Sequence, residues 1–135
     1  MKVTVRTSVR APLAIVWRAY TTPADIVKWN AASSDWHTTA ATVDLRLGGT
    51  FSSRMEAKDG SFGFDFAGTY TAVEPHRLLA YTFGERTARV EFAEGGDGVT
   101  VTVTFDAETE HSIEQQQAGW QAILDSFGRH VEALG

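Results

Sequence analysis

Residues 112–134 read SIEQQQAGWQAILDSFGRHVEAL, and this stretch decides the fold that we predict for the whole chain. Its apolar residues recur at steps of four and three, which places them on one face of a helix. That face carries Ile113, Gln117, Trp120, Leu124, Phe127, Val131 and Leu134. Ser112 and Gln115 have the spacing of a capping box, in which each side chain binds a free backbone N–H group of the other residue. Such a helix is about 33 Å long and needs an equally long apolar cover.

The residues before this helix supply the cover as a series of strands. Alternation of apolar and polar side chains predicts strands in segments 2–9, 43–47, 51–56, 62–74, 79–83, 88–92 and 99–105. Pro12 and Pro23 suit the first position of a helix, so two short helices are expected between the first two strands. Residues 30–42 are small and polar apart from Trp36, and they are predicted to form a loop.

These elements predict one α+β domain over residues 1–135, in the order strand, two helices, six strands and helix. A curved antiparallel sheet of about seven strands would wrap around the C-terminal helix. The predicted inner face of the sheet is rich in large side chains: Phe51, Met55, Phe62, Phe64, Phe66, Tyr70, Tyr81, Phe83, Phe92 and Phe105. One helix covers only part of this surface, so we expect an internal cavity with aromatic walls.

The composition excludes several classes of function. The 135 residues carry a net charge of −5 and contain no cysteine, which removes disulfides and thiolate chemistry. An acidic chain lacks the basic face that nucleic acid requires. No apolar run approaches the ~20 residues that cross a bilayer, and the N-terminus lacks the apolar core of a signal peptide, so we expect a cytoplasmic protein without a membrane partner. The four histidines have no metal-ligand spacing and no cofactor-binding motif occurs, so neither a metal nor a cofactor is expected.

Several short segments resemble one known superfamily. The resemblance to the opening of the SRPBCC (START-like, helix-grip) superfamily is carried by Val9-Arg10-Ala11-Pro12, Val16-Trp17, Ala19, Thr22-Pro23 and Trp29. Resemblance to one branch, the homologues of the activator of the heat-shock-protein-90 ATPase, is carried by Asp44-Leu45-Arg46-Leu47-Gly48-Gly49-Thr50-Phe51, Gly68-Thr69-Tyr70, Glu74-Pro75, Arg77-Leu78, Gly119-Trp120 and Leu124. Together these segments span essentially the whole chain.

The resemblance implies a helix-grip fold, in which an antiparallel sheet wraps around a long C-terminal helix and encloses a cavity. Members of the superfamily bind lipids, sterols, polyketides or plant hormones, and some cyclise or hydroxylate aromatic compounds with the help of added domains. The co-chaperones that give the branch its name have a separate N-terminal domain, which residues 1–135 do not contain. A chaperone partner is therefore not expected.

The segment Asp35-Trp36-His37 is the first polar candidate for the site. In an extended segment Asp35 and His37 point the same way, so the carboxylate could orient the imidazole as in acid–base sites. Alternatively, the segment closes over the mouth of the cavity, with Trp36 packed down and His37 hydrogen-bonded locally. Asp65 is the second charged candidate, although strict alternation sends its side chain to the outer face of its strand.

Two residues of the C-terminal helix depart from its pattern. Gln117 interrupts the apolar face, and its amide needs either a polar group of a ligand or a backbone carbonyl as a partner. Gly119 lowers helix propensity by about 1 kcal/mol relative to alanine, so we expect it to have a packing reason. A close approach of helix to sheet is predicted from the small residues beside the apolar face, which are Gly119, Ala122, Ser126 and Ala133.

The leading hypothesis is a module that binds a small, largely hydrophobic molecule between the sheet and the C-terminal helix. We predict ligand contacts from Trp29, Trp36, His37, Phe51, Met55, Phe64, Phe66, Tyr81, Phe83, Gln117, Trp120 and Leu124. One alternative is an enzyme of cyclase, hydrolase or isomerase type that uses His37 or Asp65 as its acid–base group. Another is an interaction protein, either a chaperone partner or a homodimer formed through the open edge of the sheet. The absence of a catalytic motif favours binding over catalysis.

Overall fold

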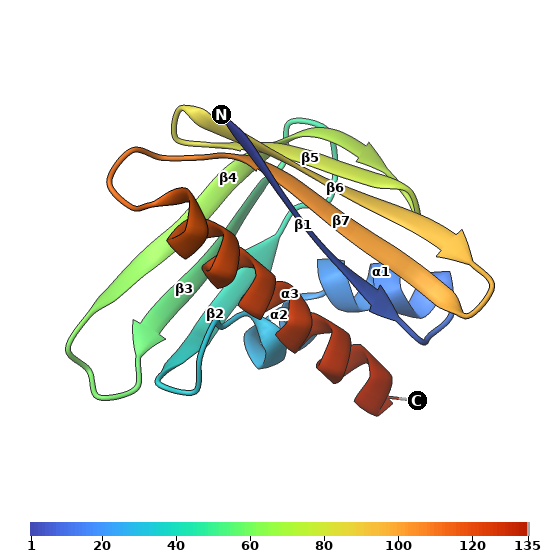
Figure 1. Cartoon of the computed structure of the whole chain (residues 1–135), viewed down its shortest axis with the longest axis horizontal. Coiled ribbons are helices and arrows are strands. Elements are labelled where there is room, and N and C mark those ends of the chain that lie inside the picture. Colours follow the sequence, from blue (N-terminus) through green and yellow to red (C-terminus); the bar gives the residue numbers. More distant parts are fainter. Residues whose placement is uncertain (135) are drawn as a thin grey trace.

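The computed structural model describes residues 1–134, whose elements follow the predicted order (Figure 1). The strands are β1 (Lys2–Val9), β2 (Trp36–Val43), β3 (Thr50–Ala57), β4 (Gly63–Glu74), β5 (Leu78–Phe83), β6 (Arg86–Gly95) and β7 (Gly98–Asp106). The helices are α1 (Leu13–Thr21), α2 (Pro23–Trp29) and α3 (Ile113–Leu134). The α+β prediction with a long C-terminal helix is confirmed.

The strands of the described residues form a single antiparallel sheet in the order β1-β7-β6-β5-β4-β3-β2. Strands β2 to β7 are neighbours in chain order, whereas β1 pairs with β7, from Lys2 opposite Asp106 to Val9 opposite Val99. Helices α1 and α2 therefore connect the two outer strands of the sheet. Because they cross from one edge to the other, they close one side of the space that the sheet encloses.

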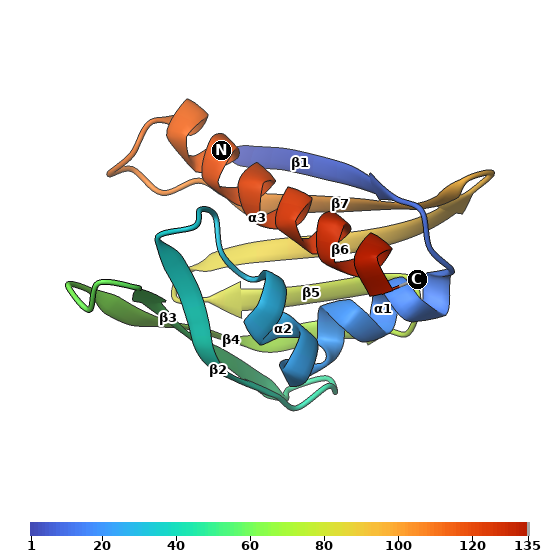
Figure 2. The same cartoon turned by 90° about the horizontal axis from the view of Figure 1, so that it is seen from below.

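The helices lie on the same face of the curved sheet (Figure 2). Helix α3 packs along β1, and α2 packs against β2. Near the C-terminal end of α3, Nε2 of His130 lies 2.9 Å from Oδ1 of Asp25, which ties α3 to the start of α2. The capping box is confirmed, because the Gln115 N–H donates to Ser112 Oγ at 3.1 Å and the Ser112 N–H donates to Gln115 Oε1 at 3.2 Å.

The close approach of α3 to the sheet occurs at Gly128 and not at Gly119. A Cβ atom on Gly128 would lie 3.5 Å from Thr7 Oγ1 of β1, whereas a Cβ atom on Gly119 would meet nothing within 4 Å. The prediction for Gly119 was therefore wrong. Gly128, one turn after Leu124, is the residue that lets the helix backbone lie against β1.

The second strand lies earlier in the chain than predicted. Residues 36–43, predicted as a loop, form β2, and residues 44–49 form a turn in place of a strand. The alternation of β2 is hidden because the strand is rich in threonine and alanine and because its register with β3 shifts between Thr38 and Ala40. The exposed fraction of Leu47 is 72%, so its alternation with Leu45 reflects no burial.

The fully buried core lies where α1 and α3 cover β1, β6 and β7. Its largest side chains include Phe105 and Phe127, and valines from β1, β6 and β7 surround them. Toward β3 and β4 the facing side chains are only partly buried, as for Phe51 and Phe66. Helices that could cross a membrane were not found in residues 1–134, since none is both long and apolar enough.

Candidate functional site

A cavity of about 310 Å³ lies between the sheet and the helices, on the side where the core is incompletely filled. Its lining comes from α1, α2, α3, Asn30 and the six strands β2 to β7. The lining residues are Tyr20, Ile26, Trp29, Asn30, Thr42, Val43, Phe51, Ser53, Met55, Phe64, Phe66, Tyr70, Leu79, Tyr81, Arg86, Val103, Trp120, Ile123 and Leu124. This volume falls at the small end of the range for small-molecule sites.

Aromatic rings form most of the cavity wall and hold one another in place. The ring of Phe51 lies edge-on to Tyr81, with centroids 4.8 Å apart, and Phe66 meets Trp120 at 6.3 Å. The indole of Trp120 is in turn stacked on Phe105 of β7 at 4.0 Å. These contacts fix the wall before any ligand arrives, which reduces the entropy that a ligand would lose in ordering it.

The three tyrosines of the chain, Tyr20, Tyr70 and Tyr81, all line this cavity. Burial raises the pKa of the Tyr70 hydroxyl to about 12. Burial, together with the neighbouring Tyr70, raises the pKa of Tyr20 well above its usual value, and the pKa of Tyr81 is raised for the same reasons. At neutral pH these hydroxyls are therefore uncharged, and each keeps a proton that it can donate in a hydrogen bond.

Arg86 is the charged residue of the cavity lining. It is the first residue of β6 and lies opposite Phe83 of β5, so both side chains project from the inner face of the sheet. The guanidinium Cζ lies 4.4 Å from the centroid of the Phe83 ring, and Nη1 donates to the Asp106 carbonyl at 3.1 Å. Arg86 also lines the cavity.

Eight of the twelve predicted ligand-contact residues line the cavity. They are Trp29, Phe51, Met55, Phe64, Phe66, Tyr81, Trp120 and Leu124. The prediction succeeded here because strand alternation and helix periodicity identify the inner face of each element. Whether these side chains contact a ligand stays a prediction.

The other four predicted residues do not line the cavity. His37 is exposed on β2, opposite Glu56 of β3, because alternation along the strand turns it to the outer face. Trp36, the first residue of β2, packs against Phe64 and Phe62. Phe83 does face inward, but the guanidinium of Arg86 lies over its ring. Its other ring contacts are with Phe66, Tyr81 and Trp120.

Gln117 is exposed, and its amide lies 3.5 Å from the Thr4 carbonyl of β1. The buried amide is that of the preceding residue, Gln116. Its Oε1 accepts from the Glu108 N–H at 2.8 Å, and its Nε2 donates to the carbonyls of His111 and Glu108 at 2.9 and 3.1 Å. Gln116 therefore fastens the loop before α3 and has no place in the cavity.

Several lining residues were not among the predicted ligand contacts, although the sequence carries a signal for some of them. Extending the alternation of Ala88, Val90 and Phe92 one step toward the N-terminus places Arg86 on the inner face. Tyr20 follows Val16 by one helical turn, so it belongs to the buried face of α1. Tyr70 was predicted on the inner face of the sheet but not as a ligand contact. The remaining missed residues were Ile26, Asn30, Thr42, Val43, Ser53, Leu79, Val103 and Ile123.

The acid–base groups of the enzyme hypothesis lie outside the cavity. Asp65 is exposed on β4 and faces Arg54 of β3, with Oδ1 3.7 Å from Nη1. His37 is also exposed, as described above. Neither group can reach a molecule held between the sheet and α3, so this assignment of acid–base residues was wrong.

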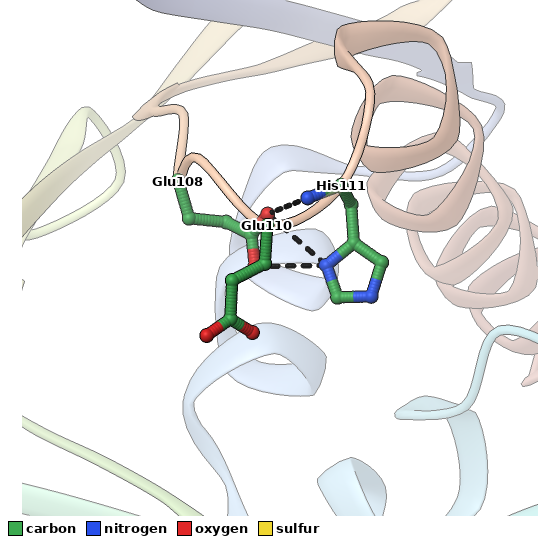
Figure 3. Close-up of side chains that lie close together, drawn as sticks. All are labelled: Glu108, Glu110 and His111. Carbon is green, nitrogen blue, oxygen red and sulfur yellow. Dashed lines mark hydrogen bonds and ion pairs between the residues drawn. The ribbon is translucent and has the colours of Figure 1, made fainter.

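A cluster of three titratable groups lies in the loop before α3 (Figure 3). The carboxylate of Glu108 accepts from the backbone N–H of His111 at 2.6 Å and lies 2.9 Å from Nδ1 of its ring. The hydrogen bond to Glu108 raises the pKa of His111, and the same contact lowers the pKa of Glu108. Glu110 and His111 are exposed. The contacts between Glu108 and His111 explain the cluster, because they close the turn that leads into α3. We call this pair the clasp.

Comparison with known proteins identifies relatives over nearly the full length. Residues 10–132 match the family model described as Activator of Hsp90 ATPase homolog 1-like protein. The solution structure of an AHSA1-like protein from Aeromonas hydrophila is similar, with 51% identity, a TM-score of 0.94, and coverage of 100% of this chain and 94% of that chain. A comparison with functionally curated proteins gave no match.

Two further solved structures extend the likeness. A protein from Cytophaga hutchinsonii shares 45% identity, with a TM-score of 0.85 and coverage of 98% of this chain and 93% of that chain. A protein from Nitrosomonas europaea has a TM-score of 0.86 at only 21% identity, with coverage of 99% and 96%, and so shares the fold alone.

Proposed function

The chain belongs to the Activator of Hsp90 ATPase homolog 1-like family, and we propose that it binds a small, largely apolar molecule in the cavity between the sheet and α3. The observation that carries this proposal is the lining of the cavity, in which aromatic and aliphatic side chains surround a few tyrosine hydroxyls. Sites for small molecules combine apolar walls with a small number of polar groups in this way.

The wall chemistry supports binding more than catalysis. The titratable side chains of the lining are Tyr20, Tyr70, Tyr81 and Arg86, and burial raises the pKa of each tyrosine. A general acid–base group needs a pKa near the working pH, which a buried tyrosine with a raised pKa lacks. A binding site has no such requirement, because neutral hydroxyls and apolar rings already provide the contacts.

Thermal unfolding with a panel of small hydrophobic compounds tests the proposal. A ligand that binds only the folded state stabilises it by about 2.7 kcal/mol at a free concentration of 100 times its Kd, so the melting temperature should rise measurably. The indole N–H resonances of Trp29 and Trp120 should shift in the NMR spectrum of the same complex, because both rings line the cavity.

A matched pair of variants on β3 locates the binding. Ser53 lines the cavity, whereas its neighbour Ser52 does not, since successive side chains of a strand point to opposite faces. Ser53→Leu fills part of the cavity and should abolish the ligand-induced rise, and Ser52→Leu should retain it. Equal responses of the two variants would place the ligand elsewhere and contradict the proposal.

A further inference from the structure

We propose that the ligand of this cavity is an apolar monocarboxylic acid whose carboxylate binds the guanidinium of Arg86. The inference rests on the proposed function, because it names the chemical class that the same cavity accepts. It is drawn from three features of Arg86: the position of its side chain, the neighbouring carboxylates, and the donors that accompany it.

Arg86 places a positively charged side chain in the lining of a largely apolar cavity. Inner-face positions of β6 carry Ala88, Val90 and Phe92, all buried, and Arg86 occupies the next position of the same row. Its side chain is only half-buried, and it lines the cavity together with Trp120. Charge in an apolar surrounding is costly unless it is paired. A guanidinium without an ion pair among residues 1–134 therefore favours an anionic ligand group.

Two carboxylates near Arg86, those of Asp106 and Glu108, are bound to other partners. Asp106 offers Arg86 only its backbone carbonyl, since its carboxylate lies 2.6 Å from Lys2 Nζ and accepts from the Thr87 N–H at 2.8 Å. The charge of Arg86 contributes to the lowered pKa of Glu108, but that carboxylate lies 2.9 Å from the ring nitrogen of His111 and forms no ion pair with Arg86. Among residues 1–134, no carboxylate forms an ion pair with Arg86. Its negative partner is therefore not supplied by the described chain.

The donors at this end of the cavity suit a planar anion with one charge. Guanidinium has five N–H donors in a fixed fork that matches a carboxylate, and only one hydrogen bond, to Asp106, is made within the described residues. Tyr81 lies close enough for the charge of Arg86 to lower the pKa of its hydroxyl, against the larger effect of burial. The neutral hydroxyl can donate a second hydrogen bond. A single cation balances a monocarboxylate better than a phosphate dianion.

Decanoate, decanol and decyl phosphate provide the test, because they share one apolar chain and differ in the polar end. Isothermal titration calorimetry at neutral pH would measure each Kd with the wild-type chain, Arg86→Gln and Arg89→Gln. Arg89 is the matched control, since it lies on the outer face of the same strand and pairs with Glu91 at 3.5 Å. Decanoate should bind about tenfold or more tightly than decanol to the wild-type chain and to Arg89→Gln, as a charge-assisted hydrogen bond implies.

The Arg86→Gln variant should lose the preference for decanoate over decanol, while its affinity for decanol stays the same as that of the wild-type chain. Equal affinities of decanoate and decanol for the wild-type chain would overturn the carboxylate proposal and leave the apolar cavity as a binding site. If decyl phosphate binds more tightly than decanoate and this binding depends on Arg86, the ligand group is a phosphate, and the carboxylate proposal is overturned. Failure of all three probes to bind would overturn both proposals.

A measurement on the wild-type chain keeps the test independent of variant folding. The side-chain Nε–H resonance of Arg86 should shift on addition of decanoate and stay in place on addition of decanol. A decanoate complex in which this resonance does not move would contradict the proposed contact, whatever the stability of Arg86→Gln.

Discussion

The indole ring of Trp120 lies flat against the ring of Phe105, with centroids 4.0 Å apart and planes 9° from parallel. One face of the indole therefore joins α3 to β7, and the ring also borders the cavity. This arrangement makes Trp120 both a core residue and a wall of the candidate site.

Trp120→Ala should lower the free energy of unfolding by about 3 kcal/mol, the lower end of the cost for removing a buried tryptophan, because the ring is only partly enclosed. Urea unfolding at equilibrium measures the change. Trp36→Ala is the control, since Trp36 is the first residue of the edge strand β2. It should lower the free energy of unfolding clearly less. A smaller loss for Trp120→Ala than for Trp36→Ala would contradict the assigned role.

Gln116 and Gln117 are adjacent and chemically identical, yet substitution should affect them differently. Gln116→Ala should cost about 2 kcal/mol, because it leaves the Glu108 N–H and two loop carbonyls without their partner. Gln117→Ala should change the free energy of unfolding by no more than about 0.5 kcal/mol, as is usual at exposed positions. Chemical denaturation of both variants checks the difference, and similar losses would show that Gln116 is not the fastening residue.

Helix α3 contains two glycines with different surroundings. Gly119→Ala and Gly128→Ala should each raise stability by up to about 1 kcal/mol through helix propensity, since a Cβ atom at either position meets nothing closer than 3.5 Å. Gly128→Leu should be destabilising because β1 leaves no room for a longer side chain, whereas Gly119→Leu should be tolerated. Melting temperatures of the four variants test this, and tolerance of leucine at both positions would be the contrary result.

Ultraviolet absorbance should detect no tyrosine that ionises with an ordinary pKa. All three tyrosines have a pKa raised above the usual 10.0, to about 12 for Tyr70. A raised pKa contributes stability that is present in full below pH 10.0 and is lost as the pH rises through the folded-state value. Ionisation should therefore accompany alkaline unfolding, followed by circular dichroism. A tyrosine that titrates near pH 10 in the folded chain would contradict the burial of these hydroxyls.

The contact between Glu108 and His111 should be visible in an NMR titration. Hydrogen bonding to Glu108 raises the pKa of His111 above 6.5, and the same contact lowers that of Glu108 below 4.5. The contribution of His111 to stability is present below pH 6.5 and is lost as the pH rises through its folded-state pKa. The contribution of Glu108 to stability is present above pH 4.5 and is lost as the pH falls through its folded-state pKa. The clasp should therefore be firmest between these two values. Glu108→Gln should return the pKa of His111 toward 6.5, and an unchanged value would rule out the contact.

The fold could be predicted because its main signals are local. Helix α3 follows from the spacing of Trp120, Leu124 and Val131, and its start follows from Ser112 and Gln115. Most strands follow from alternation in the same way. Strand β2 could not be recognised, since an edge strand buries little and the register shift after Thr38 breaks its period.

The lining of the cavity was predicted in part, for a related physical reason. Alternation and helical periodicity determine which face of an element is apolar, and this sufficed for residues such as Phe51, Phe66 and Leu124. Neighbouring positions on a helix, such as Gln116 and Gln117, differ by only about 100° of rotation, so periodicity alone does not decide which amide is buried. The loop that carries Glu108 decides it.

The sequence by itself determined the order of the elements, the apolar face of most of them, and the surplus of aromatic side chains that one helix does not cover. Only the tertiary structure decided where that surplus leaves space and that the three tyrosines line it. It also decided that Arg86 lines the same space without an ion pair to any carboxylate of residues 1–134. The reason is that local periodicity acts through neighbouring residues, whereas a cavity depends on distances between elements. Those distances are set by the pairing of β1 with β7, the curvature of the sheet and the close approach of α3 at Gly128.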